Sequence, residues 1–169
     1  ELRALAGYRD PAQDKAEAKR LLAGAGHGPD KPLRVDLVTR TLPIYLDLAS
    51  FVVDQLRLIG MEATIKQLDT AAWFPALSRR DYQIGSNLTA GGFDDPDAYL
   101  FENYKCGSPR NYTDYCSEEM DRLIDQQSQE PDRAKRLKLV AEIQRKLEAD
   151  VARPMLGWRK EYFARWPHV

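Results

Sequence analysis

Three aspartates crowd a proline in the stretch "GGFDDPDAYL", which runs from Gly91 to Leu100. Carboxylates at Asp94, Asp95 and Asp97 can ligate a metal ion, transfer protons, grip a cationic ligand or cap a helix. Glycoside hydrolysis needs two carboxylates that flank the scissile bond. The side chains of the adjacent Asp94 and Asp95 normally diverge. A hydrolase domain that uses one of them stays an alternative, and no catalytic residue is assigned.

The same loop lacks the pattern of a calcium site. An EF-hand loop places Gly at its sixth position and Glu at its twelfth. Counted from Asp95, these positions hold Leu100 and Cys106. Proline fixes φ, and aspartate side chains accept hydrogen bonds from nearby N–H groups. We expect Asp95-Pro96-Asp97 to form a capped turn. A contact with a ligand is the second interpretation, and a metal site is the third.

Cysteines and histidines are the other reactive residues. Cys106 and Cys116 flank "GSPRNYTDY", in which Gly, Ser, Pro and Asn favour turns. A disulfide can close this loop, and two free thiols are the alternative. His27 and His168 lie far from the cysteines in sequence, so the four-ligand pattern of a zinc site is missing. We expect both histidines to be exposed loop residues, and we predict no metal site and no cofactor.

Composition narrows the partners. The 25 Lys and Arg residues and 26 Asp and Glu residues give a net charge of −1 in a chain of 169 residues. A nucleic-acid-binding surface usually needs a basic excess, so none is expected. No apolar run approaches the ~20 residues that span a bilayer. The chain opens with "ELRALAGYRDP", which is typical of the middle of a longer protein.

Hydrophobic periodicity predicts the elements that position these residues. A helix capped by Asp10 or Asp14 runs to about residue 23. Alternation predicts strands over 33–40 and 61–68, with a helix over 43–60 between them. Such a unit should be parallel and right-handed. The apolar stripe of the predicted helix consists of Leu48, Phe51, Val52, Leu56 and Ile59.

The second half of the chain predicts more helices than strands. We expect Pro75 to interrupt a short helix. Two amphipathic helices close the domain, and a module that binds another protein through them is a further alternative. The predicted elements are a helix over 70–81, a strand over 82–89, a short helix over 98–104, helices over 117–128 and 131–150, and a strand-like segment over 152–166. Met120, Leu123, Ile124, Val140, Ile143, Leu147 and Val151 should face inward in the closing helices.

Four segments occur in an order that resembles one family. They are "DKAEAKRLLAGAGHG", "FVVDQLRLIGMEATIKQLD", "YQIGSNLTAGGFDDPDAYL" and the closing stretch from "NYTDYC" to "MLGW". Together they cover nearly the whole chain. They resemble the C-terminal lobe of the family 5 extracellular solute-binding proteins, which are the dipeptide-, oligopeptide- and nickel-binding components of ABC importers.

This resemblance implies a fold and a function. The fold class is α/β: a lobe like those of type II periplasmic binding proteins, with a mixed sheet and a βαβ unit flanked by helices. Residues 1–169 would form a single lobe of a longer, two-lobed, non-enzymatic protein. We expect a monomer whose partners are a peptide or other small organic solute and ABC permease subunits. A periplasmic or extracellular location, membrane-anchored in a Gram-positive host, is implied and agrees with a disulfide.

Ligands of open α/β sheets sit beyond the carboxyl ends of the strands. The loops there are 39–43, 69–73 and 89–97. The candidate ligand-binding residues are Arg40, Thr41, Trp73, Thr89, Phe93 and Asp94, with Arg110 and Asn111 at the rim. A solvated surface charge is the equal alternative for Arg40 and Arg110, as is a core aromatic for Trp73.

The chain departs from the peptide binders of the family at one position. Those proteins carry Gly-Trp ahead of this loop and then an aspartate that pairs with the peptide's α-amino group. Alignment on Asp95-Pro96-Asp97 puts Gly92 at that position, with Thr89 near the place of the Trp. Asp94 is a candidate replacement. A peptide, a nickel chelate, a sugar, an opine or another small organic ligand all stay open.

Overall fold

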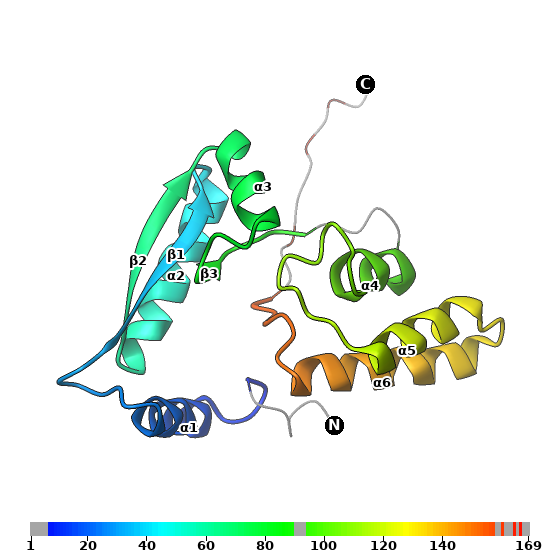
Figure 1. Ribbon diagram of the computed structural model, residues 1–169, viewed down its shortest axis with the longest axis horizontal. Coiled ribbons are helices and arrows are strands. Elements are labelled where there is room, and N and C mark those ends of the chain that lie inside the picture. Colours follow the sequence, from blue (N-terminus) through cyan, green and yellow to red (C-terminus); the bar gives the residue numbers. More distant parts are fainter. Residues whose placement is uncertain (1–6, 90–93, 158–159, 161–163, 165, 167–169) are drawn as a thin grey trace.

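The computed structural model describes residues 7–89, 94–157, 160, 164 and 166. Helix α2 runs along one face of a small sheet, and α4, α5 and α6 stack as a second group (Figure 1). In chain order the elements are α1 (Pro11–Gly24), β1 (Leu33–Arg40), α2 (Pro43–Leu58), β2 (Met61–Leu68), α3 (Thr70–Ser78), β3 (Ile84–Gly85), α4 (Pro96–Tyr104), α5 (Glu118–Gln129) and α6 (Arg133–Ala149).

The sheet has the strand order β2-β1-β3, and both pairs are parallel. β1 and β2 pair in register over all eight residues, from Leu33 opposite Met61 onward. The predicted parallel βαβ unit and the α/β fold class are therefore confirmed. The antiparallel strand that a mixed sheet requires is not among the residues that the structure describes. β3 is much shorter than the predicted strand over 82–89, because Gly85 and Asn87 are poor strand formers.

The two long strands differ in how they are buried. β2 alternates between half-buried and exposed residues over 61–66, as predicted, and Gln67 breaks the pattern near its end. β1 alternates only in its first half, because Leu37, Val38 and Thr39 are buried in succession. The carboxyl end of β1 is thus covered on both faces, and side chains there are held firmly.

Helix α2 begins at the predicted residue and ends at Leu58, two residues before the predicted end. Its inward face is the predicted one except at Phe51, because Leu48, Val52, Leu56 and Ile59 are half-buried. Pro43 lies in its first turn, and Gly60 follows its end with φ = 90°, a conformation that glycine adopts without strain. The buried residues of α2 are Tyr45 and Ala49, whereas Phe51 is 58% exposed. The prediction that Phe51 faces inward was wrong. The helix turns the row through Tyr45 and Ala49 to the sheet, and Phe51 lies on the other side.

Helices α5 and α6 confirm the two predicted closing helices. The row of inward-facing residues on α6 ends before Val151, where it was predicted to end. Met120, Ile124, Ile143 and Leu147 are buried. Val151 is 65% exposed, against the prediction, because α6 ends at Ala149 and the chain turns away with φ = 51° at Val151.

Two other predictions need correction. Pro75 does not interrupt α3, which runs through it to Ser78; the buried Trp73 and Leu77 outweigh one lost helical hydrogen bond. Of the strand-like segment predicted over 152–166, the described residues lie in no strand, and the others lie outside the described residues.

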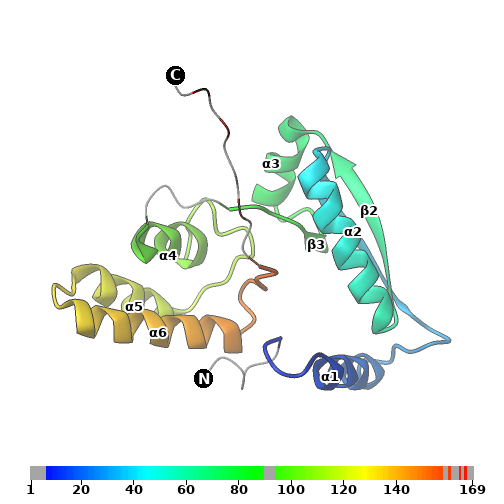
Figure 2. The same cartoon turned by 180° about the vertical axis from the view of Figure 1, so that it is seen from behind.

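The sheet with α2 and α3 lies apart from α4, α5 and α6 (Figure 2). Within the described residues, each of these halves has one cluster of buried hydrophobic side chains. The cluster of the sheet half contains Val38, Tyr45, Trp73 and Leu77. Buried residues of the helical half are Leu100, Tyr104, Met120, Ile124, Ile143, Leu147 and Ala152. The Tyr82 hydroxyl links the halves by donating a hydrogen bond of 2.7 Å to the carbonyl oxygen of Tyr112. Within the described ranges, no helix is long and apolar enough to cross a membrane.

Candidate ligand-binding site

The loops after β1 and β2 are joined to each other at the carboxyl edge of the sheet. Thr41 donates from its backbone N–H and from Oγ1 to the carbonyl oxygen of Leu68, at 2.9 and 3.1 Å. Asp69 caps α3 by accepting a hydrogen bond of 2.8 Å from the N–H of Ala72. Thr41 is exposed, so its side chain is accessible beside this joint.

Arg40, the last residue of β1, is held by neutral side chains. Its Nη1 donates to the Tyr45 hydroxyl at 3.2 Å, and its Nη2 donates to Oγ1 of Thr70 at 2.7 Å. The guanidinium carbon lies 4.9 Å from the ring centre of Tyr45 and 5.5 Å from those of Trp73 and Phe74. Aromatic faces attract a cation through their quadrupoles.

The positive charge of Arg40 has no counter-ion among the residues that the structure describes. Its buried Nε also lacks a hydrogen-bond partner there. Buried donors are normally paired, so an unpaired one on a half-buried cation marks a place where an anion is favourable. The alternative of a freely solvated surface charge does not describe Arg40.

Trp73 lies in the core behind Arg40. Its side chain is fully buried and packs edge-on against Tyr45 and Phe74, with ring centres 5.8 and 4.9 Å apart. Its Nε1 is buried without a partner in the described part of the chain. The burial corresponds to the core-aromatic interpretation, and the Trp73 ring contacts the Arg40 guanidinium.

The Asp-Pro-Asp segment has the predicted capped turn. Asp95 is the N-cap of α4 and accepts a hydrogen bond of 2.8 Å from the N–H of Asp97. Its carboxylate also accepts two hydrogen bonds from Arg136, at 2.8 and 2.6 Å. The Arg136 guanidinium and the N–H of Asp97 lower the pKa of Asp95. Asp95 is therefore a structural carboxylate.

Of the other loop candidates, Thr89 and Asp94 are exposed. Asp94 has no hydrogen-bond or ion-pair partner within the described residues. Phe93 lies outside those residues, as does Gly92. The loop therefore offers one free carboxylate, next to the anchored Asp95.

The cysteine loop is closed by a disulfide between Cys106 and Cys116, whose Cα atoms are 4.7 Å apart. The alternative of two free thiols was wrong. Asn111 is buried inside the loop and donates to the carbonyl oxygens of Lys105 and Tyr115, at 3.1 and 2.6 Å. Its amide is thus used to stabilise the loop, away from any rim.

Arg110 is exposed and pairs with Glu102 at 3.3 Å. This matches the alternative of a solvated surface charge. Such an exposed ion pair contributes little to stability, so Arg110 can leave Glu102 at small cost.

Sequence reasoning missed the residues that surround Arg40. Tyr45, Thr70 and Phe74 contact its guanidinium. Thr70 and Phe74 lie in the same segment as Trp73, "DTAAWF", directly after a predicted strand. That position could have marked them as candidates for the site. Tyr45 carried none, because one aromatic in the first turns of a helix is ordinary.

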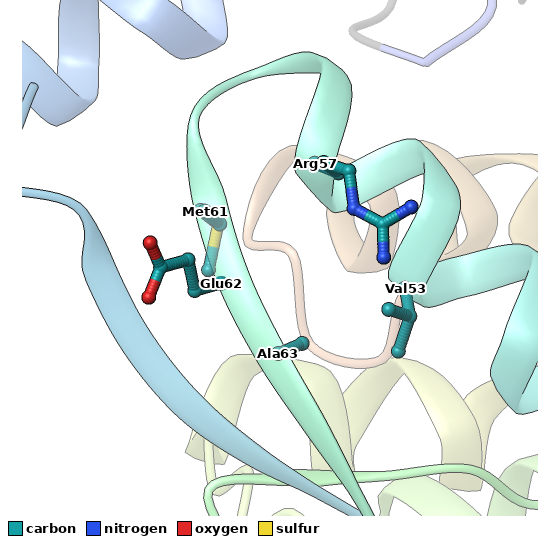
Figure 3. Close-up of a pocket in the computed structure, with 5 residues that line it drawn as sticks. All are labelled: Val53, Arg57, Met61, Glu62 and Ala63. Atoms are coloured by element: carbon teal, nitrogen blue, oxygen red, sulfur yellow. The ribbon is translucent and has the colours of Figure 1, made fainter. Parts of the chain in front are cut away.

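Two hollows lie away from this edge. The first has a volume of 120 Å³ and lies at the amino end of β2, between that strand and the last turns of α2 (Figure 3). The second has a volume of 310 Å³ and lies between the end of α4 and the disulfide. Neither includes Arg40.

Solved structures with the same fold are bacterial binding proteins. OppA of Burkholderia pseudomallei matches with a TM-score of 0.76 and 24% identity, over 85% of this chain and 28% of that chain. OppA of Haemophilus influenzae, in complex with RPPGFSPFR, matches with a TM-score of 0.79 and 17% identity, over 85% of this chain and 29% of that chain. NikA of Staphylococcus aureus, in complex with Ni(L-His)₂, matches with a TM-score of 0.70 and 24% identity, over 82% of this chain and 30% of that chain. The fold is that of a type II periplasmic binding protein.

The sequence model of the bacterial extracellular solute-binding proteins, family 5 Middle, matches residues 4–111. The chain belongs to family 5 of the bacterial extracellular solute-binding proteins. It is 28% identical over 150 residues to the di/tripeptide-binding protein 2 of Pseudomonas aeruginosa (strain UCBPP-PA14). That match covers 83% of the chain and 28% of the relative, so the chain spans little more than a quarter of its relative's length.

Proposed function

We propose that this chain is one lobe of the substrate-binding component of an ABC importer, and that Arg40 binds an anionic group of a small organic solute. The observation that carries the proposal is the Arg40 guanidinium, which is fixed by Tyr45, Thr70 and three aromatic rings and has no counter-ion among the described residues. A peptide is the leading class of solute, because its carboxylate suits Arg40 and because a relative is named as a di/tripeptide-binding protein.

The partial coverage of the relatives supports a two-lobed protein with the ligand between the lobes. Closure of the second lobe over the carboxyl edge excludes water from Arg40. Charge pairing strengthens when water leaves a site, so closure and anion binding favour each other. The closed form then presents a defined surface to the permease subunits. The protein would work outside the cytoplasm, in the periplasm or at the outer surface, as a monomer and without catalysis.

The other candidate contacts follow from exposure. Thr41 and Thr89 offer hydroxyl groups, and Asp94 offers a carboxylate without a partner in the described residues. We propose that Asp94 faces a cationic group of the solute, such as an amino group. Arg110 and Phe93 remain proposed contacts at the rim. A hydrolase that uses Asp95 gains no support, because Arg136 and the cap of α4 occupy its carboxylate.

Thermal unfolding of the full-length protein with added dipeptides, tripeptides, sugars and nickel chelates tests this function. We expect peptides to raise the Tm, because a ligand that binds only the folded state stabilises it. Arg40→Gln should weaken peptide binding about tenfold or more, since a hydrogen bond to a charged group is lost.

The matched control is Arg34→Gln. Arg34 lies on the same strand, is exposed and pairs with Glu62 at 2.6 Å, far from the carboxyl edge. It should leave affinity unchanged. No stabilisation by any class of ligand, together with turnover of a test substrate, would contradict the proposed function.

A further inference from the structure

Four polar side chains form one network where α4, α5 and α6 meet. Arg136, in the first turn of α6, donates from Nη1 and Nη2 to the two carboxylate oxygens of Asp95, at 2.8 and 2.6 Å. Its Nε donates to Oε1 of Gln127, near the end of α5, at 3.2 Å. Gln127 in turn donates from Nε2 to Oδ1 of Asp97, in the first turn of α4.

This network is buried at its centre. The Gln127 side chain is fully buried, and both ends of its amide are paired. The side chains of Arg136 and Asp95 are 28% and 43% exposed, so the ion pair lies at the edge of the network. A planar guanidinium that meets a carboxylate with two parallel hydrogen bonds fixes orientation as well as distance.

The anchored carboxylate determines where the candidate ligand loop ends. Asp95 is extended, with φ = −142° and ψ = 134°, and its side chain also caps α4 through the N–H of Asp97. Asp94 precedes it by one peptide bond. The direction in which Asp94 leaves the start of α4 therefore depends on how Arg136 holds Asp95.

We propose that Arg136 is a positioning residue for ligand binding: through Asp95 and Gln127 it fixes the start of α4 and so holds Asp94 at the cleft. This inference rests on the proposed function and adds to it a residue on α6 that touches no ligand. The loss of Arg136 frees the Asp95 carboxylate and leaves the buried Gln127 amide oxygen unpaired. The start of α4 then has several orientations in place of one.

Joining α5 to α6 is the competing role, and another ion pair provides the control. Lys146 on α6 donates to Glu119 on α5 at 2.7 Å. This pair joins the same two helices at their other ends, away from Asp94. Lys146→Gln thus removes a polar contact between α5 and α6 without touching the start of α4.

The experiment compares Arg136→Gln, Arg136→Lys and Lys146→Gln in the full-length protein. Titration calorimetry with dialanine and trialanine measures affinity. Hydrogen exchange of the Asp97 amide, without ligand, measures how firmly the Asp95 carboxylate holds that N–H group. We expect Arg136→Gln to weaken binding about tenfold and to speed exchange of that amide. Arg136→Lys, which keeps the charge but not the fork, should lie between the wild type and Arg136→Gln. Lys146→Gln should match the wild type in both measurements.

Unchanged affinity in Arg136→Gln, or equal losses in Arg136→Gln and Lys146→Gln, would overturn the positioning role. Failure of the wild-type protein to bind either peptide is a different result, because it removes the peptide class from the proposed function and the positioning of a peptide contact with it. The wild-type titration therefore separates the two failures.

Discussion

A cation fixed among neutral groups is the chemical feature of this chain at the scale of single residues. Arg40 donates to two hydroxyl groups and lies against three rings, and no carboxylate of the described residues forms an ion pair with it. Each such ring contact contributes roughly 0.5–1 kcal/mol at an exposed site. Trp73 provides one of these rings and fills the core behind it. Packing and electrostatics at the edge therefore depend on one another.

Trp73→Ala should lower the free energy of unfolding by about 3–5 kcal/mol, since it empties a fully buried position. Phe74→Ala is the matched control. Phe74 is the next residue, lies at the same 5.5 Å from the Arg40 guanidinium and is 46% exposed, so its loss should cost much less. Urea denaturation measures both. Equal losses would mean that contact with Arg40, and not burial, makes Trp73 important.

Asp95 should make the stability depend on acid. Its folded-state pKa lies below its ordinary value of 3.8 because Arg136 and the N–H of Asp97 favour the charged form. The stabilisation is therefore present above about pH 4 and disappears as the pH falls through the lower, folded-state pKa. The Tm difference between wild type and Asp95→Asn should be largest near neutral pH and shrink in acid. A difference that does not vary with pH would contradict this, and Asp94→Asn controls for the change in charge.

Among the elements, the disulfide loop joins the sheet half to the helical half. Cys106 follows α4, and Cys116 precedes α5. Between them, Tyr112 accepts the hydrogen bond of Tyr82, and Asp114 pairs with Arg80 at 2.5 Å. The loop is thus fixed covalently at its base and by polar contacts at its outer end.

Removal of the disulfide in Cys106→Ser/Cys116→Ser should reduce stability by about 3 kcal/mol, the entropy of closing a loop of this length. The chain has only these two cysteines, so a reducing agent should destabilise the wild type by a similar amount and leave the double variant unchanged. Guanidinium denaturation with and without reductant checks both. Equal stability of oxidised and reduced wild type would contradict the expected role.

For the whole molecule, the exposed apolar residues are notable. Ile44, Phe51 and Leu58 recur every seven residues on the outer side of α2, at 40%, 58% and 50% exposure. Such a row can pack against another part of a longer protein, and the chain spans little more than a quarter of its relative's length.

The isolated chain should bind dialanine at least roughly tenfold more weakly than the full-length protein, because a ligand between two lobes loses half of its contacts. Titration calorimetry on both proteins measures the ratio. Circular dichroism of the isolated chain must first show helix content in line with α1–α6. Equal affinities would contradict a ligand cleft shared between lobes.

Much of the fold and part of the candidate site could be predicted from the sequence, at the places where local pattern and burial agree. β1 and β2 were predicted at their observed ends, and α2 at its observed start and within two residues of its end. Alternation, a proline in the first turn and a glycine after the last are local signals. Asp95 was predicted as a capping residue for the same reason. Phe51 was assigned to the wrong face, because the rotation of a helix about its axis depends on what it packs against.

By itself, the sequence determined the parallel βαβ unit, the capped Asp-Pro-Asp turn and the meeting of the loops after β1 and β2 at one edge. These follow from the spacing of apolar residues and from backbone chemistry, which act over a few residues. Only the tertiary structure decided that Trp73 is core, that Asn111 is turned inward and that Arg136 holds Asp95. Each of those contacts joins side chains from different elements or depends on burial, and their geometry exists only after the helices and strands have packed.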